Sequence, residues 1–193
     1  MIDPAGTDMT VQPEYDLLYP LSMFRRTRGI PDLSNEVLDG SEIPQPYRDL
    51  LVRNSDMTSQ LEQFHGGTIY LDGLNSSNDN RAYFSEFALR LEGDERLVEY
   101  GAIEITLTAL PADIKAEVLA VRRPLGGILN RHRISYDSVP KAFLKIVPDE
   151  AICEILGSCE EPLYGRCNEI TGFNGEIYAR IVEILPPVPR SSD

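Results

Sequence analysis

The spacing of apolar and polar positions predicts three helices in the central part of the chain. The first begins after Asp56, a residue type that caps helix N-termini, and ends at Gly66-Gly67. Three apolar residues between these points recur at helical spacing: Met57, Leu61 and Phe64. Pro111 and Pro124 are each expected to open a further helix, because proline is tolerated in a first helical turn.

Other apolar runs have the length and punctuation of β-strands. The dipeptide Asn174-Gly175 supplies the two positive φ angles of a tight hairpin turn, and Gly93-Asp94 separates another pair of runs. The polar stretch 75–80 is expected to be a loop. The predicted strands cover residues 68–72, 83–91, 97–107, 167–171 and 176–185. Hairpins interrupted by helices predict an α+β fold, with a mostly antiparallel sheet covered by helices on one face.

The ends of the chain lack such periods. We expect residues 1–44 to form an irregular arm, 45–187 a single domain, and 188–193 a disordered tail rich in proline and serine. The chain has 193 residues, of which 42% are hydrophobic, and this is sufficient for one sizeable core.

Charge and composition narrow the possible partners. Lys and Arg total 18 against 31 Asp and Glu, so the net charge of -13 repels nucleic acid and anionic membranes. No apolar run is long enough to span a membrane and no leader segment is apparent, which predicts a cytoplasmic protein. Three cysteines without a CxxC pattern predict reduced thiols, and with two histidines no metal site is expected.

Glu183 is the main candidate for a functional side chain. Side chains alternate along a strand, and Glu183 is the only polar member of its row: Ile177, Ala179, Ile181, Glu183 and Leu185. If this row faces the interior, the buried carboxylate can donate a proton or hold a ligand hydroxyl near neutral pH. Two plainer interpretations stay open: the row faces solvent at a sheet end, or Glu183 pairs with an arginine across the sheet.

Several short motifs resemble the chorismate pyruvate-lyase family in order and spacing. They lie between residues 45 and 187, and each is weak by itself. The motifs are Asn54-Ser55-Asp56-Met57-Thr58 followed by Leu61-Glu62, then Val98 to Ile103, Pro124 to Leu129, Leu163-Tyr164-Gly165-Arg166, and Val182 to Pro186.

The resemblance implies an antiparallel sheet with helical flaps over a closed pocket, in a monomer or weak homodimer. Enzymes of this family release pyruvate from chorismate to give 4-hydroxybenzoate, without a metal or organic cofactor. By the resemblance, Glu183 holds the hydroxyl end of the substrate, Met57 lines the pocket, and Leu125 contacts the ligand next to Gly126. The same fold also serves as the effector-binding domain of some bacterial transcription regulators.

Two departures from the family pattern remove positive charge from the expected pocket. The arginine that pairs with the ligand carboxylate is replaced by Ser85, and a second basic position is replaced by Ala102. Burying an unpaired carboxylate costs several kcal/mol, so this pocket favours a less charged ligand. A displaced anchor among other arginines, or a packing role for both small residues, are the alternatives. The candidate anchors are Arg53, Arg81, Arg122, Arg123 and Arg166.

Three further residues are weaker candidates. Phe87 is expected to line the pocket beside Ser85, and Glu104 is either a second pocket acid or a solvated strand residue. Tyr83 is a possible ligand contact, although aromatic residues at strand spacing more often belong to a core.

These observations support three functions. The preferred one is a cofactor-independent enzyme with a repurposed pocket, a lyase or cyclase of specialised metabolism, in which Glu183 polarises or protonates the substrate. The alternatives are an authentic chorismate pyruvate-lyase and a non-catalytic sensor of a small ligand. The sensor is the least favoured, since about 45 irregular residues, and no recognisable DNA-binding segment, precede the matched region.

Overall fold

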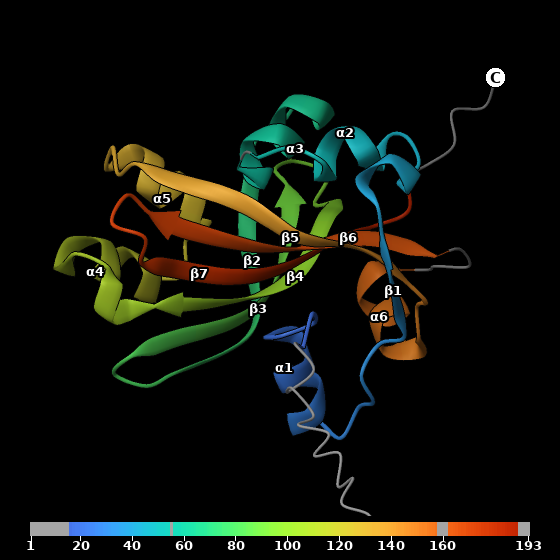
Figure 1. Ribbon diagram of the computed structural model, residues 1–193, viewed down its shortest axis with the longest axis horizontal. Helices are drawn as coiled ribbons and strands as arrows, with labels where there is room; N and C mark the ends of the chain where they lie inside the picture. The colour runs from blue at the N-terminus through green and yellow to red at the C-terminus, as the bar shows by residue number, and fades with distance from the viewer. Residues whose placement is uncertain (1–15, 55, 158–161, 189–193) are drawn as a thin grey trace, which may run out of the picture.

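The computed structural model describes residues 16–54, 56–157 and 162–188. These residues form an antiparallel sheet of seven strands in the order β1-β5-β6-β7-β4-β3-β2 (Figure 1). The strands are β1 (Asn35–Leu38), β2 (Ile69–Asn78), β3 (Ala82–Leu91), β4 (Leu97–Thr106), β5 (Tyr136–Ile146), β6 (Leu163–Gly172) and β7 (Ile177–Leu185). The expected α+β class with an antiparallel sheet is confirmed.

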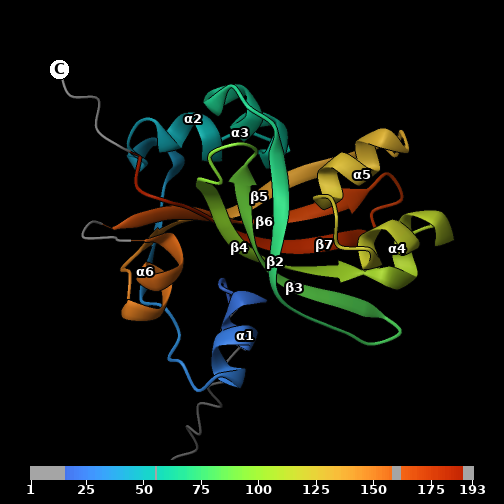
Figure 2. The same ribbon diagram turned by 180° about the vertical axis from the view of Figure 1, so that it is seen from behind.

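Helices pack against the sheet and divide its apolar side chains into two layers. Helices α2 to α5 cover one face, as expected, and α1 and α6 in addition pack against the other (Figure 2). The helices are α1 (Leu21–Thr27), α2 (Tyr47–Leu51), α3 (Met57–His65), α4 (Ala112–Leu119), α5 (Leu125–Arg131) and α6 (Glu150–Leu156), with short 3-10 helices at Gly40–Glu42 and Leu107–Ala109. Both faces of the central strands are therefore buried.

Helix α3 begins and ends where its sequence signals predict. The Asp56 side chain accepts a hydrogen bond from the Ser59 backbone N–H at 3.1 Å, and Gly66 has a φ of 67°, which suits glycine at a helix end. Met57 and Leu61 are buried, whereas Phe64 is 44% exposed. Helices α4 and α5 follow Pro111 and Pro124 as expected.

The hairpin between β6 and β7 forms, but its turn differs from the expected type. Gly175 has a φ of 80°, whereas Asn174 does not have a positive φ. The Gly175 N–H donates to the Gly172 carbonyl at 2.9 Å, and the Gly172 N–H donates to the Glu176 carbonyl at 2.8 Å. These bonds define a three-residue loop, 173–175, with glycine at its left-handed position. The expectation of a two-residue turn is wrong because Phe173 also belongs to the loop.

The polar stretch 75–80, expected to be a loop, is mostly strand. β2 continues to Asn78 and pairs with β3 through Ser76 opposite Ser85, after a register shift between Gly73 and Asn75. β2 lies at an edge of the sheet, where backbone pairing to one neighbour holds the strand and polar side chains reach solvent. The Asn75 amide nitrogen also donates to the buried Glu86 carboxylate at 2.6 Å.

The segment before residue 45 is more ordered than the expected irregular arm. It contains α1 and β1, and β1 pairs with β5 at the other edge of the sheet. Arg25 of α1 is buried, donates to the Pro31 carbonyl at 2.8 Å, and forms an ion pair with Asp149 at the start of α6. The division into arm, domain and tail stays a prediction, and residues 1–15 and 189–193 lie outside the described part.

Two further observations concern the cysteines and the membrane. Cys153 is disulfide-bonded, so the expectation of three reduced thiols is wrong at this position, while the buried Cys167 is free. The local sequence lacks a motif that distinguishes a disulfide from a thiol, because pairing depends on backbone geometry. Within the described residues, no helix is long and apolar enough to cross a membrane.

Candidate ligand-binding site

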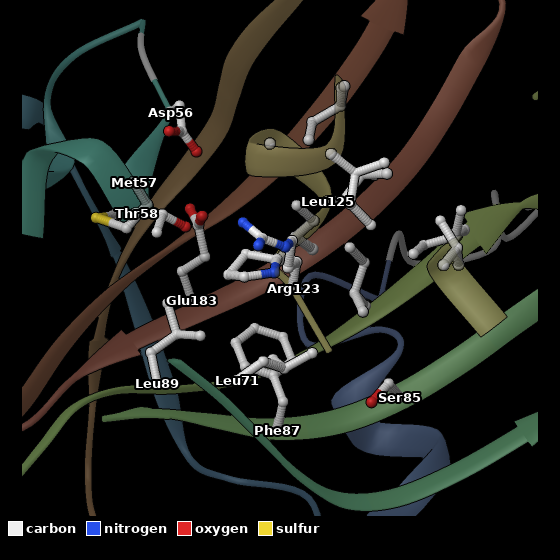
Figure 3. Close-up of a pocket in the computed structure, with 18 of the residues that line it drawn as sticks. Asp56, Met57, Thr58, Leu71, Ser85, Phe87, Leu89, Arg123, Leu125 and Glu183 are labelled. Atoms are coloured by element: carbon white, nitrogen blue, oxygen red, sulfur yellow. The ribbon is translucent and has the colours of Figure 1, made fainter. Parts of the chain in front are cut away.

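A cavity of about 70 Å³ lies between the sheet and the helices α3, α4 and α5. This is more than the roughly 10–15 Å³ that one water molecule needs. Its lining is mainly apolar, and Figure 3 shows Leu71, Phe87 and Leu89 on the strand side and Met57 and Leu125 on the helix side. Such a concave, mostly apolar space with a few polar groups is typical of a small-molecule site.

Glu183 projects from β7 into this cavity and is 4% exposed. Figure 3 shows its carboxylate extending from the sheet toward Met57 and Thr58 at the start of α3. On the neighbouring strand, Gly101 lies directly opposite Glu183, and a Cβ at this glycine would come within 2.2 Å of the Val182 carbonyl oxygen. The row of Glu183 is not exposed to solvent, which was one of the two plainer interpretations, because Ala179, Ile181 and Leu185 are buried.

Arg166 lies opposite Glu183 on the other neighbouring strand, β6, and its guanidinium forms an ion pair with the Glu183 carboxylate. Arg166 is 0% exposed and also donates to the carbonyls of Leu51 at 3.1 Å and Arg53 at 2.9 Å. The plainer interpretation of Glu183, pairing with an arginine across the sheet, therefore describes its contact in the structure. Arg166 is occupied by these groups and does not line the cavity.

A second buried acid, Glu99 of β4, lines the same cavity and was missed by the sequence analysis. Glu99 is 2% exposed, and its Oε2 atom has no hydrogen-bond partner among the described residues. Burial raises the pKa of Glu99 well above its usual value, and the negative charge of Glu183 raises it further. The sequence carried a signal for it, because Glu99 is the one charged residue in a strand row with Gly101 and Ile103.

Two other buried polar atoms in the cavity have no hydrogen-bond partner among the described residues. They are the hydroxyl of Tyr83 on β3 and the Oδ1 atom of Asn168 on β6. The Asn168 amide nitrogen is used, because it donates to the Ser138 hydroxyl at 2.9 Å. Buried polar groups are seldom left without a partner, so these atoms are places where a ligand can bind.

The structure brings together most of the predicted site residues, but not all. Five of them line the cavity with Glu183: Met57, Ser85, Phe87, Leu125 and Gly126. Ala102 and Glu104 do not line it. They alternate with Ile103 and therefore project from the other face of the sheet, where Ala102 is packed and Glu104 contacts Arg180 at 3.3 Å.

The arginines proposed as displaced anchors do not converge in the cavity. Arg123 lines it but is exposed, and Arg166 is committed to Glu183. Within the described ranges, no group of three or more His, Cys, Asp or Glu residues is arranged to hold a metal ion. The site therefore consists of a mainly apolar lining, three buried polar atoms without a hydrogen-bond partner among the described residues, and one buried ion pair.

The fold of this chain is similar to that of solved proteins. No family model matches the chain, and no curated protein sequence matches it. The chain resembles PhnF from Mycobacterium smegmatis with 12% identity and a TM-score of 0.55, over 70% of this chain and 65% of that one. It also resembles the separately solved effector domain of PhnF with 12% identity and a TM-score of 0.51, over 69% of this chain and 91% of that domain. The fold is the chorismate-lyase-like fold of effector domains.

This comparison corrects the preferred function. The chain spans about 65% of the length of PhnF, and the part of PhnF solved by itself is named an effector domain, not a lyase. The expectation of a lyase or cyclase is therefore wrong, and so is the alternative of an authentic chorismate pyruvate-lyase. The motifs that resemble the lyase family report the fold, because a fold is shared by proteins of different function.

Proposed function

We propose that this domain is a non-catalytic sensor that binds a small, largely apolar molecule in the cavity. The observation that carries this proposal is a mainly apolar cavity with three buried polar atoms that have no hydrogen-bond partner in the described part of the chain, on Tyr83, Glu99 and Asn168. Unpaired polar atoms reduce stability unless a ligand or water satisfies them. A ligand that satisfies them gains affinity and specificity from the same groups.

The charges around the cavity disfavour a strongly anionic ligand. Asp56, Glu99 and Glu183 contribute carboxyl groups, Arg123 contributes one exposed guanidinium, and the buried guanidinium nearby, Arg166, is occupied. Ser85 offers a hydroxyl where the lyase pattern has an arginine. A dianion would therefore enter a region with excess acidic groups and without a free buried cation among the described residues.

A path from the cavity to the rest of the domain supports sensing. Arg166 contacts Glu183 with one part of its guanidinium and the carbonyls of Leu51 and Arg53 with another. These carbonyls lie at the end of α2 and just before α3, whose residues Met57 and Thr58 line the cavity. A ligand that moves the Glu183 carboxylate therefore acts on the α2–α3 connection through a single side chain.

The shared fold adds support by analogy. The matched domain of PhnF is named an effector domain, and the chain has the same arrangement of sheet and helices. The expected exclusion of nucleic acid is not supported. A small-molecule partner is consistent with the findings.

The test is binding without conversion. Thermal unfolding in the presence of a library of small aromatic and alicyclic compounds should reveal stabilising ligands, since a ligand at 100 times its Kd adds about 2.7 kcal/mol of stability. Mass spectrometry after long incubation should recover these compounds unchanged. Multiple-turnover conversion of a bound compound would contradict a sensor, and the absence of any ligand would contradict a binding domain.

A matched pair of variants tests the location. Leu125→Trp fills the cavity from α5 and should abolish stabilisation by these ligands, because Leu125 lines it. Leu119→Trp on the adjacent α4 should have no effect on binding, because Leu119 is 42% exposed and does not line the cavity.

A further inference from the structure

Glu99 occupies one end of the cavity, next to the Glu183–Arg166 ion pair. Gly101, two residues along β4, lies directly opposite Glu183, which makes Glu183 the diagonal neighbour of Glu99 across the sheet. Residues in this arrangement have side chains on the same face. The Oε2 atom of Glu99 is nevertheless not satisfied by any described residue.

The charged groups around Glu99 include no cation that pairs with Glu99 alone. Glu183 on β7 and Asp56 at the start of α3 act on it as like charges, and Arg166 on β6 is the one opposite charge among its main influences. Arg166 already binds the Glu183 carboxylate and two backbone carbonyls. The surroundings therefore contain more acid than base, and burial raises the pKa of Glu99, which favours its protonated form.

The remaining unpartnered atoms lie toward the other end of the cavity. Asn168 on β6 lies opposite Ile181 on β7, and Ile181 lies opposite Ile103 on β4. Asn168 is therefore at the level of Ile103, which is four residues along β4 from Glu99. Four strand residues span about 13 Å. Tyr83, opposite Ile105, is farther still from Glu99 along the strand. A ligand that reaches both ends is consequently elongated, with apolar surface between its polar ends.

We propose that this ligand carries a protonated amine at one end and that Glu99 is the residue that binds it. The inference rests on the proposed sensor function and names the class of ligand. A hydroxyl group forms only ordinary hydrogen bonds with a protonated Glu99, whereas an ammonium group forms a stronger charge-assisted bond with the ionised carboxylate and offsets the excess of acid. Glu99 releases its proton when the amine binds.

Matched sets of probes test this proposal. Each set has one aryl-alkyl body that ends in an amine, an alcohol or a carboxylate, such as 4-phenylbutylamine, 4-phenylbutan-1-ol and 4-phenylbutanoate, with chains of two to six carbons. Binding is measured by ligand-observed NMR and calorimetry for the wild-type protein, Glu99→Gln and Glu104→Gln. Glu104 is the control because it lies on the same strand and projects from the opposite face, against Arg180.

We expect amines to bind the wild type and Glu104→Gln at least ten-fold more tightly than the matched alcohols. Glu99→Gln should weaken amine binding at least ten-fold and change alcohol binding by less than three-fold. Calorimetry near pH 7 in phosphate and in Tris should show proton release when an amine binds the wild type, and this release should be absent in Glu99→Gln.

The possible failures separate the two proposals. Preference for alcohols or carboxylates, an amine preference that persists in Glu99→Gln, or binding without proton release would overturn the role of Glu99 and leave a ligand-binding domain. If no probe of any class binds in the cavity, both the amine site and the sensor function are overturned.

Discussion

Arg166 lies directly opposite Glu183 in the pairing of β6 with β7, and the two side chains form an ion pair inside the domain. Arg166 is completely buried and Glu183 nearly so. A buried pair of this kind offsets two desolvation costs, and the removal of one partner leaves the other charge uncompensated. The pair therefore stabilises the fold and holds Glu183, which lines the cavity.

The first prediction follows from this burial. Arg166→Met should lower the free energy of unfolding by about 3–5 kcal/mol, because Glu183 and two backbone carbonyls lose their donor. Urea unfolding at pH 7 measures the loss. Arg166→Met combined with Glu183→Met should recover part of it, since no unpaired charge remains.

Arg180→Met is the matched control on β7. Arg180 also pairs with two glutamates, Glu104 and Glu169, but its side chain is 40% exposed. Its loss should cost at most about 1 kcal/mol. Equal losses for the Arg166 and Arg180 variants would show that burial does not govern the strength of the Arg166 pair.

The second prediction concerns the pH dependence of stability. Burial first, and Glu183 second, raise the pKa of Glu99 well above its ordinary 4.5. The folded protein therefore retains a proton that the unfolded chain has lost, and stability falls as pH rises from that ordinary value through the pKa of the folded state. The contribution reaches about 1.4 kcal/mol for each pH unit in this range. Urea unfolding at pH 5, 6, 7 and 8 should show this decline in the wild type.

Glu99→Gln should remove this part of the decline, because an amide keeps the shape of the protonated acid and does not titrate. The variant should consequently be more stable than the wild type at pH 8, and the difference should shrink toward pH 5. Glu104→Gln provides the comparison and should keep the wild-type slope. A wild type and Glu99→Gln with parallel pH profiles would refute an elevated pKa for Glu99.

The sequence predicts the elements whose signals are local. The Asp56 cap and Gly66 end define α3, and the alternation along 177–185 places Glu183 on the cavity face. Asn174-Gly175 marks the last hairpin correctly, although the loop includes Phe173. These features depend on a few adjacent residues, and the tertiary structure does not override them.

Other features depend on contacts between distant segments, which periodicity does not reveal. The polar end of β2 is a strand because β3 pairs with it, and α1 is held by Arg25 through Asp149 on α6. Strand alternation in β4 could have identified Glu99 and excluded Ala102 and Glu104 from the cavity. The resemblance to the lyase family gave Ala102 precedence instead, although its motifs specify the fold and not the chemistry.

A third prediction compares two adjacent glycines in α5. A Cβ at Gly126 would come within 2.3 Å of the Asp56 Oδ1 atom, whereas a Cβ at Gly127 would meet no heavy atom within 4 Å. Gly126→Ala should separate α5 from the start of α3 and cost more than about 1 kcal/mol, as overpacking does. Gly127→Ala should stabilise the protein by roughly 0.5–1 kcal/mol, since alanine favours a helix interior. Thermal and urea unfolding of both variants measure the difference, and similar effects would argue against close contact between α3 and α5.

The last prediction reintroduces the charge that Ser85 lacks. Ser85 is 3% exposed, lies opposite Ile103 and lines the cavity on β3, so Ser85→Arg places a guanidinium in the part of the cavity away from Glu99. The new cation should shift the preference among the matched probes from amines toward carboxylates, because it can pair with a carboxylate and repels an incoming ammonium.

Ser85→Ala separates this charge effect from the loss of the hydroxyl, and it should leave the order of probe affinities unchanged. Calorimetry with the amine and carboxylate probes measures both variants, and circular dichroism checks that each retains the wild-type fold. A Ser85→Arg protein that is folded but still prefers amines would show that Ser85 does not face the bound ligand. The cavity would then select its ligand by the Glu99 end alone, and the replacement of the lyase arginine by Ser85 would have no part in specificity.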